Sequence, residues 1–160
     1  MTKGVIYYAT GEYYLKEAEL SAESLKKVMP EIDITLYGDS EPETEYFDNF
    51  VKIKQHQHPW LHRISCLKST PYEKTLFLDS DTYVCEEIGE LFEILDRFDI
   101  AAVHGPGRYN EKYDYQRDTT QAFPDFNCGV ILFNKKPEVI DFFTQWEGEY
   151  KQYVDSELTD

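Results

Sequence analysis

The sequence predicts an α/β fold in which a mostly parallel central sheet is flanked by helices on both faces. Short apolar runs, typical of buried parallel strands, alternate with segments whose apolar residues recur at helical spacing. This alternation continues along almost all of the 160 residues, without an internal repeat or a linker-like tract. Alternating strands and helices of this kind build one sheet with helices packed on it, so we expect a single domain spanning residues 1–160.

The individual elements follow from local pattern and from prolines that begin or end helices. Residues 5–9 form a continuous apolar run, whereas residues 32–36 alternate apolar with polar, and both patterns are typical of strands. Pro30 ends the helix after the first strand, and Pro59 suits the first turn of the next helix. The expected order is a strand at 5–9, a helix at 15–29, strands at 32–36 and 51–53, a helix at 59–67, a strand at 75–78, a short helix at 91–98, strands at 100–103 and 130–133, and a helix at 139–153.

Charge and composition argue against several classes of protein. The formal net charge of −15 disfavours general nucleic-acid binding, which needs basic residues to displace the counterions of the phosphates. No apolar stretch approaches the ~20 residues of a membrane-spanning helix, and the N-terminal residues lack the regions of a signal peptide. The three cysteines show neither a C-x-x-C motif nor a disulfide framework. We therefore expect a cytoplasmic protein with reduced thiols.

Sheets of this class bind ligands in the loops beyond the carboxyl ends of their strands. The loops of interest therefore follow Ala9, Tyr37, Leu78, Val103 and Phe133. After the first strand there is neither a G-x-G-x-x-G fingerprint nor a phosphate loop ending in Gly-Lys-Ser/Thr. This absence disfavours Rossmann dehydrogenases and P-loop NTPases.

The turn Asp79-Ser80-Asp81 is the sharpest chemical candidate in the chain. Two carboxylates two residues apart can converge on one hard divalent cation, and Mg²⁺ and Mn²⁺ prefer such oxygen ligands. The pattern alone says little, because about one D-x-D triplet is expected by chance at this aspartate content. Its position directly after the apolar run TLFL places it at the carboxyl end of an expected strand. Position alone leaves two interpretations open, a metal site and an Asx-type turn that caps the strand.

Three segments together resemble GT-A-fold glycosyltransferases, most closely the glycogenin-like family 8 enzymes and related nucleotide-diphospho-sugar transferases. PYEKTLFLDSDTYV is similar to the D-x-D region of that family. GVIYYATGEYY resembles its first strand and nucleotide loop, and PDFNCGVILFN resembles its F-N-S-G-V strand. With Arg63, sixteen residues before Asp79, these segments occur in the family's order, and the resemblance extends over nearly the whole chain. The ordered set is fairly specific, whereas the D-x-D triplet alone is weak.

The resemblance implies a nucleoside-diphosphate sugar, often a UDP-sugar, as donor, an acceptor of unknown kind, and Mn²⁺ or Mg²⁺ as cofactor. It implies that Asp79 and Asp81 bind the cation, and that the cation and Arg63 stabilise charge on the leaving diphosphate. It suggests retention at the anomeric carbon. The candidates for catalytic contacts with the transferred sugar are Asp125, Asn127 and Asp160. The residues implied to contact the nucleotide sugar are Ala9, Thr10, Gly11, Tyr14, Arg63, Asp79, Ser80 and Asp81.

The chain departs from the family pattern at three points. Cys128 replaces the usual serine of the F-N-S-G motif, and Arg63 replaces the commoner lysine but keeps its charge. The sequence ends at Asp160, whereas family members continue to a C-terminal histidine that is a third metal ligand and to a nearby lysine. From this resemblance we expect a GT-A domain that lacks its C-terminal portion.

Other interpretations of the same residues stay open at this point. Arg63 could be a surface residue paired with a glutamate, Tyr14 could pack, and Asn127 and Asp125 could satisfy backbone groups. For the whole chain, the alternative is a non-catalytic nucleotide-sugar-binding or assembly module. A sugar nucleotidyltransferase ranks third, because the segment ATGEYY lacks the basic residues usual after the first strand of that class.

Overall fold

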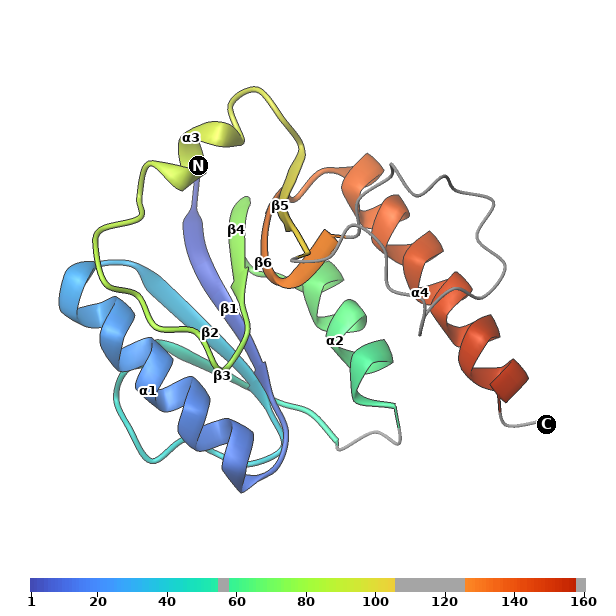
Figure 1. Cartoon of the computed structure of the whole chain (residues 1–160). Coiled ribbons are helices and arrows are strands. Elements are labelled where there is room, and N and C mark those ends of the chain that lie inside the picture. Colours follow the sequence, from blue (N-terminus) through green and yellow to red (C-terminus); the bar gives the residue numbers. More distant parts are fainter. Residues whose placement is uncertain (55–57, 106–125, 158–160) are drawn as a thin grey trace.

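The computed structural model describes residues 1–54, 58–105 and 126–157, and within them one six-stranded sheet. Its strand order is β3-β2-β1-β4-β6-β5 (Figure 1). The strands are β1 (Lys3–Ala9), β2 (Asp33–Gly38), β3 (Asn49–Lys52), β4 (Lys74–Leu78), β5 (Ile100–His104) and β6 (Phe126–Asn134). The helices are α1 (Glu12–Val28), α2 (Pro59–Lys68), α3 (Leu91–Ile94) and α4 (Pro137–Glu157).

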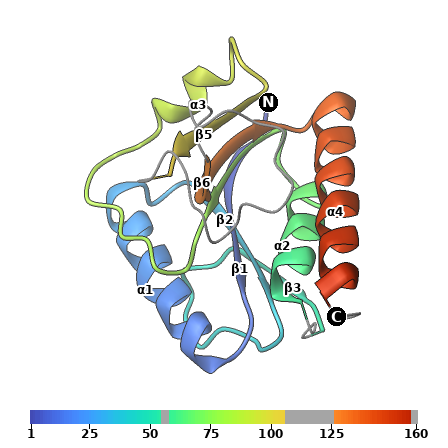
Figure 2. The same cartoon turned by 45° about the vertical axis from the view of Figure 1, so that its right-hand side comes forward.

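The sheet is parallel from β3 through β2 and β1 to β4, as the alternation of strands and helices predicts. Helix α1 connects β1 to β2, and helix α2 connects β3 to β4. Figures 1 and 2 place α1 on one face of the sheet and α2 with α4 on the other. The expected fold class, a mostly parallel sheet with helices on both faces, is confirmed.

Strand β6 runs antiparallel to both of its neighbours, β4 and β5. Leu78 at the end of β4 therefore pairs with Val130, and Lys74 at its start pairs with Asn134. The expectation that the loop after Phe133 lies at the ligand-binding edge is wrong, because that loop lies at the opposite edge. It is the first residues of β6, among them Asn127 and Cys128, that lie beside the end of β4.

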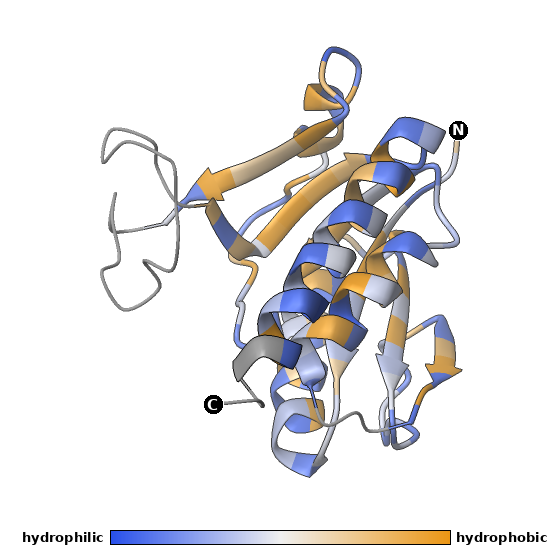
Figure 3. Cartoon of the chain, turned by 90° about the vertical axis from the view of Figure 1, so that its right-hand side faces the viewer, coloured by the Kyte–Doolittle hydropathy of each residue, from blue (hydrophilic) through white to orange (hydrophobic). Residues whose placement is uncertain are grey.

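Each face of the sheet has its own hydrophobic core, because successive residues of a strand point to opposite faces. Along β1, Val5 and Tyr7 pack in the core beneath α1, whereas Ile6 packs in the core shared with α2 and α4. In the second core the rings of Phe133 and Phe143 meet edge to face at 4.9 Å. Figure 3 shows hydrophobic residues concentrated on the strands, whereas the outward-facing turns of the helices are mainly hydrophilic.

Helix α2, which carries Arg63, is fixed against α4 by a small polar cluster. Ser65 and Lys68 lie one helical turn apart, and both contact the carboxylate of Glu147 on α4. Burial of Ile64 and Leu67 on the same helix against the sheet adds apolar stabilisation, roughly 1.5–3 kcal/mol for each side chain. Arg63 is thus presented by a helix that is held on two sides.

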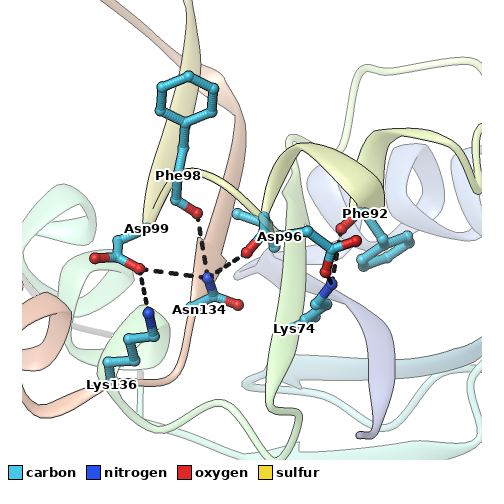
Figure 4. Close-up of polar contacts among 8 residues, drawn as sticks. Lys74, Phe92, Asp96, Phe98, Asp99, Asn134 and Lys136 are labelled. Carbon is cyan, nitrogen blue, oxygen red and sulfur yellow. Dashed lines mark hydrogen bonds and ion pairs between the residues drawn. The ribbon is translucent and has the colours of Figure 1, made fainter.

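At the other edge of the sheet, polar side chains fasten the segment around α3. Lys74, only 5% exposed, donates to the carbonyl of Phe92 and pairs with Asp96 (Figure 4). The amide nitrogen of Asn134 donates to the carbonyl oxygens of Leu95, at 2.8 Å, and Phe98, at 3.2 Å. None of the helices in the described ranges combines the length and apolarity needed to cross a membrane.

Candidate functional site

The loop after β1 and the loop after β2 are joined at the carboxyl edge of the sheet by hydrogen bonds from a backbone N–H to a side chain. The N–H of Gly11 donates to both carboxylate oxygens of Asp39, at 3.0 and 3.1 Å. Gly11 has φ 87°, a conformation that residues with a side chain disfavour, although among the described residues a Cβ there would meet no atom within 4 Å. Glycine is therefore required by the backbone conformation, and it begins α1 just after Ala9 and Thr10, which are both buried.

The first turn of α1 presents two tyrosines to solvent near this loop. Tyr14 is 54% exposed, and its ring meets that of Tyr13 edge to face at 5.4 Å. Tyr14 therefore packs on its neighbour at the surface and is not part of the buried core. One turn further on, the Glu17 carboxylate accepts a hydrogen bond of 3.1 Å from the Ser80 hydroxyl and so connects α1 to the acidic turn.

Arg63 extends from helix α2 to the acidic turn at the end of β4. Its Nη1 lies 2.9 Å from Oδ1 of Asp79, and its Nη2 donates to the carbonyl of Cys128. The guanidinium lies between two rings, 4.7 Å from the Trp60 centroid and 4.5 Å from that of Phe77, where cation–π attraction adds to the ion pair. Only 7% of Arg63 is exposed, so the alternative of a surface arginine paired with a glutamate is wrong.

The pKa values at this pair show that burial outweighs the ion pair. Burial raises the pKa of Asp79, Arg63 opposes the rise, and the nearby negative charge of Asp81 adds to it. Burial also lowers the pKa of Arg63, against the attraction of Asp79. A carboxylate whose charged form is disfavoured although an arginine contacts it is typical of functional sites. A bound cation would relieve the repulsion between Asp79 and Asp81.

The backbone of the acidic turn is held from two directions. The N–H of Asp79 donates to the carbonyl of Gly129 at 2.8 Å, which joins the turn to β6. The carbonyl of Asp79 accepts from the N–H of Thr82 at 3.3 Å and from its hydroxyl at 2.8 Å. The Thr82 hydroxyl continues to Ser21 on α1, at 2.7 Å, and Ser21 continues to Tyr7, at 2.9 Å.

Sequence reasoning missed this hydroxyl chain, although the sequence contains a signal for it. Ser21 and Ser24 fall on the same helical face as Ala18, Ala22 and Leu25, and the structure buries all five. Buried hydroxyl groups need hydrogen-bond partners, so serines within an apolar helical stripe indicate a polar network beneath the helix.

Gly129 is the point at which β6 approaches the acidic turn most closely. A Cβ at Gly129 would lie 2.8 Å from Oδ2 of Asp79 and 2.9 Å from Oδ1 of Asn127. The same Asn127 oxygen accepts the Gly129 N–H at 2.7 Å, as the backbone-satisfying interpretation of Asn127 predicts. The carboxylate of Asp79 and the amide oxygen of Asn127 therefore both lie next to the Cα of Gly129, on the side where a Cβ would stand. Asp125 and Asp160, the other two candidates for catalytic contacts, lie outside the described residues.

The arrangement of the acidic turn fits a divalent cation shared with a ligand. In the described ranges, no three or more His, Cys, Asp or Glu residues are grouped so that they could bind a metal by themselves. Mg²⁺ in particular is often held by one or two carboxylates together with substrate phosphates and water. Asp79 and Asp81 would supply two carboxylates of that kind, with Asp81 exposed and Oδ1 of Asp79 held by Arg63.

A hollow of about 700 Å³ lies next to Asn127 and Cys128, between strands β5 and β6 and helix α4. Its walls are mainly apolar, with Ile131, Phe142 and Trp146 among them. Such walls do not suit a diphosphate, because burying an uncompensated charge is unfavourable. The charged groups that suit phosphates lie instead on the other side of β6, around Asp79 and Arg63.

No protein-family model and no curated protein matches the sequence. Among solved structures, the chain is similar to the glycosyltransferase GlyE of Streptococcus pneumoniae TIGR4, with a TM-score of 0.65 and 20% identity. This likeness covers all of the chain and 40% of GlyE. The galactosyltransferase LgtC, whose structure contains donor and acceptor sugar analogues, aligns with a TM-score of 0.62 and 16% identity over 93% of this chain and 65% of LgtC.

The bifunctional glycosyltransferase WbbM is a third such structure, with a TM-score of 0.58 and 16% identity over 91% of this chain and 34% of WbbM. At these identities the likeness concerns the fold. The chain has the GT-A type of α/β fold that the sequence predicts, and it spans less than two thirds of the length of each of these three proteins.

Proposed function

We propose that the chain binds a nucleoside-diphosphate sugar and belongs to a metal-dependent glycosyltransferase that transfers the sugar to an acceptor. The proposal rests mainly on the acidic turn at the end of β4, where buried Arg63 contacts Asp79 and Asp81 lies close by. The fold of the three glycosyltransferases described above supports it. So does the position of the Ala9–Gly11 loop and of Asn127, which lie at the same edge of the sheet.

The charged groups suit the diphosphate of the donor. Asp79 and Asp81 would hold Mn²⁺ or Mg²⁺, which would supply positive charge against the leaving nucleoside diphosphate. Arg63 holds Asp79 in place and contributes a second, fixed positive charge in a partly dehydrated site. Preorganised charges of this kind typically contribute a few kcal/mol to lowering a barrier.

The two sides of the acidic turn suit different parts of the donor. Ala9, Thr10, Gly11 and Tyr14 would contact the base and ribose, because they lie at or just after the end of β1, the neighbour of β4. Asn127 lies on the β6 side and would orient hydroxyls of the transferred sugar, together with Asp125 and Asp160. A UDP-sugar as donor, retention at the anomeric carbon and membership of family 8 are parts of this proposal. The acceptor is a glycan, a protein or a small molecule.

Calorimetric binding of a panel of UDP-sugars, with Mn²⁺ and with a chelator, tests the donor site. We expect Mn²⁺-dependent binding that is lost in the double variant Asp79→Ala/Asp81→Ala. Glu31→Ala/Asp33→Ala is a matched control, because it removes two exposed carboxylates at the same spacing where β2 begins, at the opposite edge of the sheet. Binding that survives the Asp79/Asp81 change, or that is lost equally in the control, would contradict the proposed site. If no UDP-sugar binds, the same measurement with GDP- and CMP-sugars shows whether the donor carries a different nucleotide or the proposed site is wrong.

A non-catalytic donor-binding or assembly module is the second candidate, because the chain spans only part of the glycosyltransferases that it resembles. Both candidates bind the donor, but only the enzyme turns it over. Release of the nucleoside diphosphate, measured with and without candidate acceptor sugars, distinguishes them. Slow hydrolysis of the bound donor supports the enzyme, and stable binding without any release supports the module.

A further inference from the structure

Three hydroxyl groups connect the core beneath α1 to the acidic turn. Tyr7 and Ser21 are fully buried, and Thr82 is the residue directly after Asp81. The oxygen–oxygen distances are 2.9 Å from Tyr7 to Ser21 and 2.7 Å from Ser21 to Thr82. The Thr82 hydroxyl oxygen in turn lies 2.8 Å from the Asp79 carbonyl oxygen. We call Tyr7, Ser21 and Thr82 the hydroxyl relay.

Counting protons fixes the direction of the hydroxyl relay. A carbonyl oxygen only accepts, so the single proton of the Thr82 hydroxyl is donated to Asp79. Ser21 must then donate to Thr82, and Tyr7 must donate to Ser21, because each hydroxyl has one proton. All three bonds therefore point toward the acidic turn, and bonds aligned in this way strengthen one another. Burial raises the pKa of Tyr7 to about 12, so Tyr7 keeps its proton at neutral pH.

The carbonyl that receives the relay controls the geometry of the two carboxylates. It belongs to the peptide that joins Asp79 to Ser80, so its orientation sets the backbone path from Asp79 to Asp81. The Asp79 side chain is independently held by Arg63, and its N–H by Gly129. The same carbonyl also accepts the Thr82 N–H at 3.3 Å, and the Ser80 hydroxyl is bonded to Glu17. The relay supplies the shorter of the two bonds to the carbonyl and so helps to fix the direction in which the chain leaves Asp79 towards Asp81.

We infer that Tyr7, Ser21 and Thr82 are positioning residues that hold the Asp79–Asp81 turn in the geometry needed for cation and donor binding. This inference rests on the proposed function for its binding consequence, but the ordering of the turn can be measured without any donor. Removal of Thr82's hydroxyl breaks the bond to Asp79 itself. Removal of the Tyr7 hydroxyl breaks only the first bond of the relay and has the smaller effect.

Thr82→Val removes the last hydroxyl of the relay with little change in shape. We expect faster amide hydrogen exchange at residues 80–82 by NMR and roughly 10-fold weaker Mn²⁺-dependent donor binding, the effect typical of losing an outer-shell contact. Thr82→Ser keeps the hydroxyl and should restore both. Tyr7→Phe should shift both readouts in the same direction by less.

The control is Thr75→Val, at the opposite end of β4. Thr75 is fully buried, and its hydroxyl is bonded to that of Thr70 at 2.8 Å, so its removal also breaks a buried hydroxyl pair. We expect Thr75→Val to lower stability without changing exchange at residues 80–82 or donor binding. Tyr72→Phe serves the same purpose for Tyr7, because Tyr72 is buried and bonded to Thr35 at 2.7 Å.

The two readouts separate the inference from the proposed function. If the unaltered chain binds no donor, the proposed donor site fails, and the exchange rates still decide whether the relay orders the turn. If Thr82→Val leaves exchange at residues 80–82 no different from that in Thr75→Val, the positioning role is overturned. The positioning role is also overturned if the unaltered chain binds the donor and Thr82→Val binds it equally well.

Discussion

At each end of strand β4 a buried basic side chain is paired with an acid. The pKa of the acid is shifted in opposite directions in the two pairs. At the amino-terminal end, Lys74 contacts exposed Asp96 and lowers the pKa of that carboxyl group. At the carboxyl end, Arg63 contacts Asp79, yet burial raises the pKa of Asp79 above its ordinary value. The fold favours the charged form of Asp96 and disfavours the charged form of Asp79.

This difference separates a structural contact from a candidate functional one. Lys74 fastens the α3 segment to the sheet, because it also donates to the Phe92 carbonyl (Figure 4). The pair at Asp79 gains less for stability, because two partly buried charges lose hydration when they meet. Groups held against their preferred protonation state concentrate at sites that bind or react.

The largest effect is expected when the cation of each pair is removed. Arg63→Ala leaves Asp79 without its partner and empties the space between Trp60 and Phe77. We expect a loss of about 3 kcal/mol in the free energy of unfolding, measured in urea, and loss of Mn²⁺-dependent donor binding.

Lys74→Met is the counterpart at the other end of β4. It leaves the Phe92 carbonyl without this donor, so unfolding should become easier by about 1–2 kcal/mol, with donor binding unchanged. Equal effects of Arg63→Ala and Lys74→Met on donor binding would remove the distinction between the two ends.

An intermediate effect is expected from a single methyl group at Gly129. Gly129→Ala places a Cβ within 3 Å of both Asp79 and Asn127, so at least one of these side chains must move. We expect donor binding to weaken roughly 10-fold. Gly148→Ala is the control, because in the described part of the chain a Cβ at that position of α4 would meet no atom within 4 Å beyond its own helical backbone. It should leave binding unchanged and raise stability by about 0.5–1 kcal/mol.

The smallest effect is expected when either acid is replaced by uncharged asparagine. The stability of the two variants relative to the unaltered chain should depend on pH in opposite directions. The pKa of Asp79 is raised in the folded chain, so its ionisation lowers stability as pH rises from the ordinary value of 3.8 through the raised one. Asp79→Asn should therefore be more stable than the unaltered chain at neutral pH and lose that advantage in acid.

The pKa of Asp96 is lowered, so its contribution to stability is present above 3.8 and is lost as pH falls through the folded value. Asp96→Asn should therefore be less stable at neutral pH and equal in acid. Urea midpoints at several pH values measure both differences. A difference of the same sign in the two variants would show that Asp79 is an ordinary stabilising acid.

The sequence predicted the parallel part of the sheet because its signals are local. Residues 5–9 and 75–78 are short apolar runs, and each is bounded by polar or turn residues. The position of Asp79 at the carboxyl end of β4 follows from the same local pattern. The acidic turn was therefore identified from its place in the sheet, which the D-x-D triplet alone could not have given.

Tertiary features were harder to predict. The first residues of β6 are only partly buried or exposed, so the apolar run indicated a start at Val130 instead of Phe126. Nothing in that run shows that β6 returns antiparallel to β4, and this direction is what brings Asn127 to the site. Helical spacing predicted that Arg63 lies on a helix, but it did not predict that the side chain contacts the rings of Trp60 and Phe77. Contacts between segments far apart in sequence decide these features.

The stacking of Trp60 on Arg63 has an optical consequence. Trp60 is 55% exposed, and its ring centroid lies 4.7 Å from the Arg63 guanidinium, which also contacts Asp79. A ligand that changes the charge or the position of Asp79 therefore changes the electric field across this ring. The chain has one other tryptophan, Trp146 on α4. With Trp146 replaced by phenylalanine, Trp60 becomes an intrinsic fluorophore whose emission follows occupancy of the acidic turn without any attached dye.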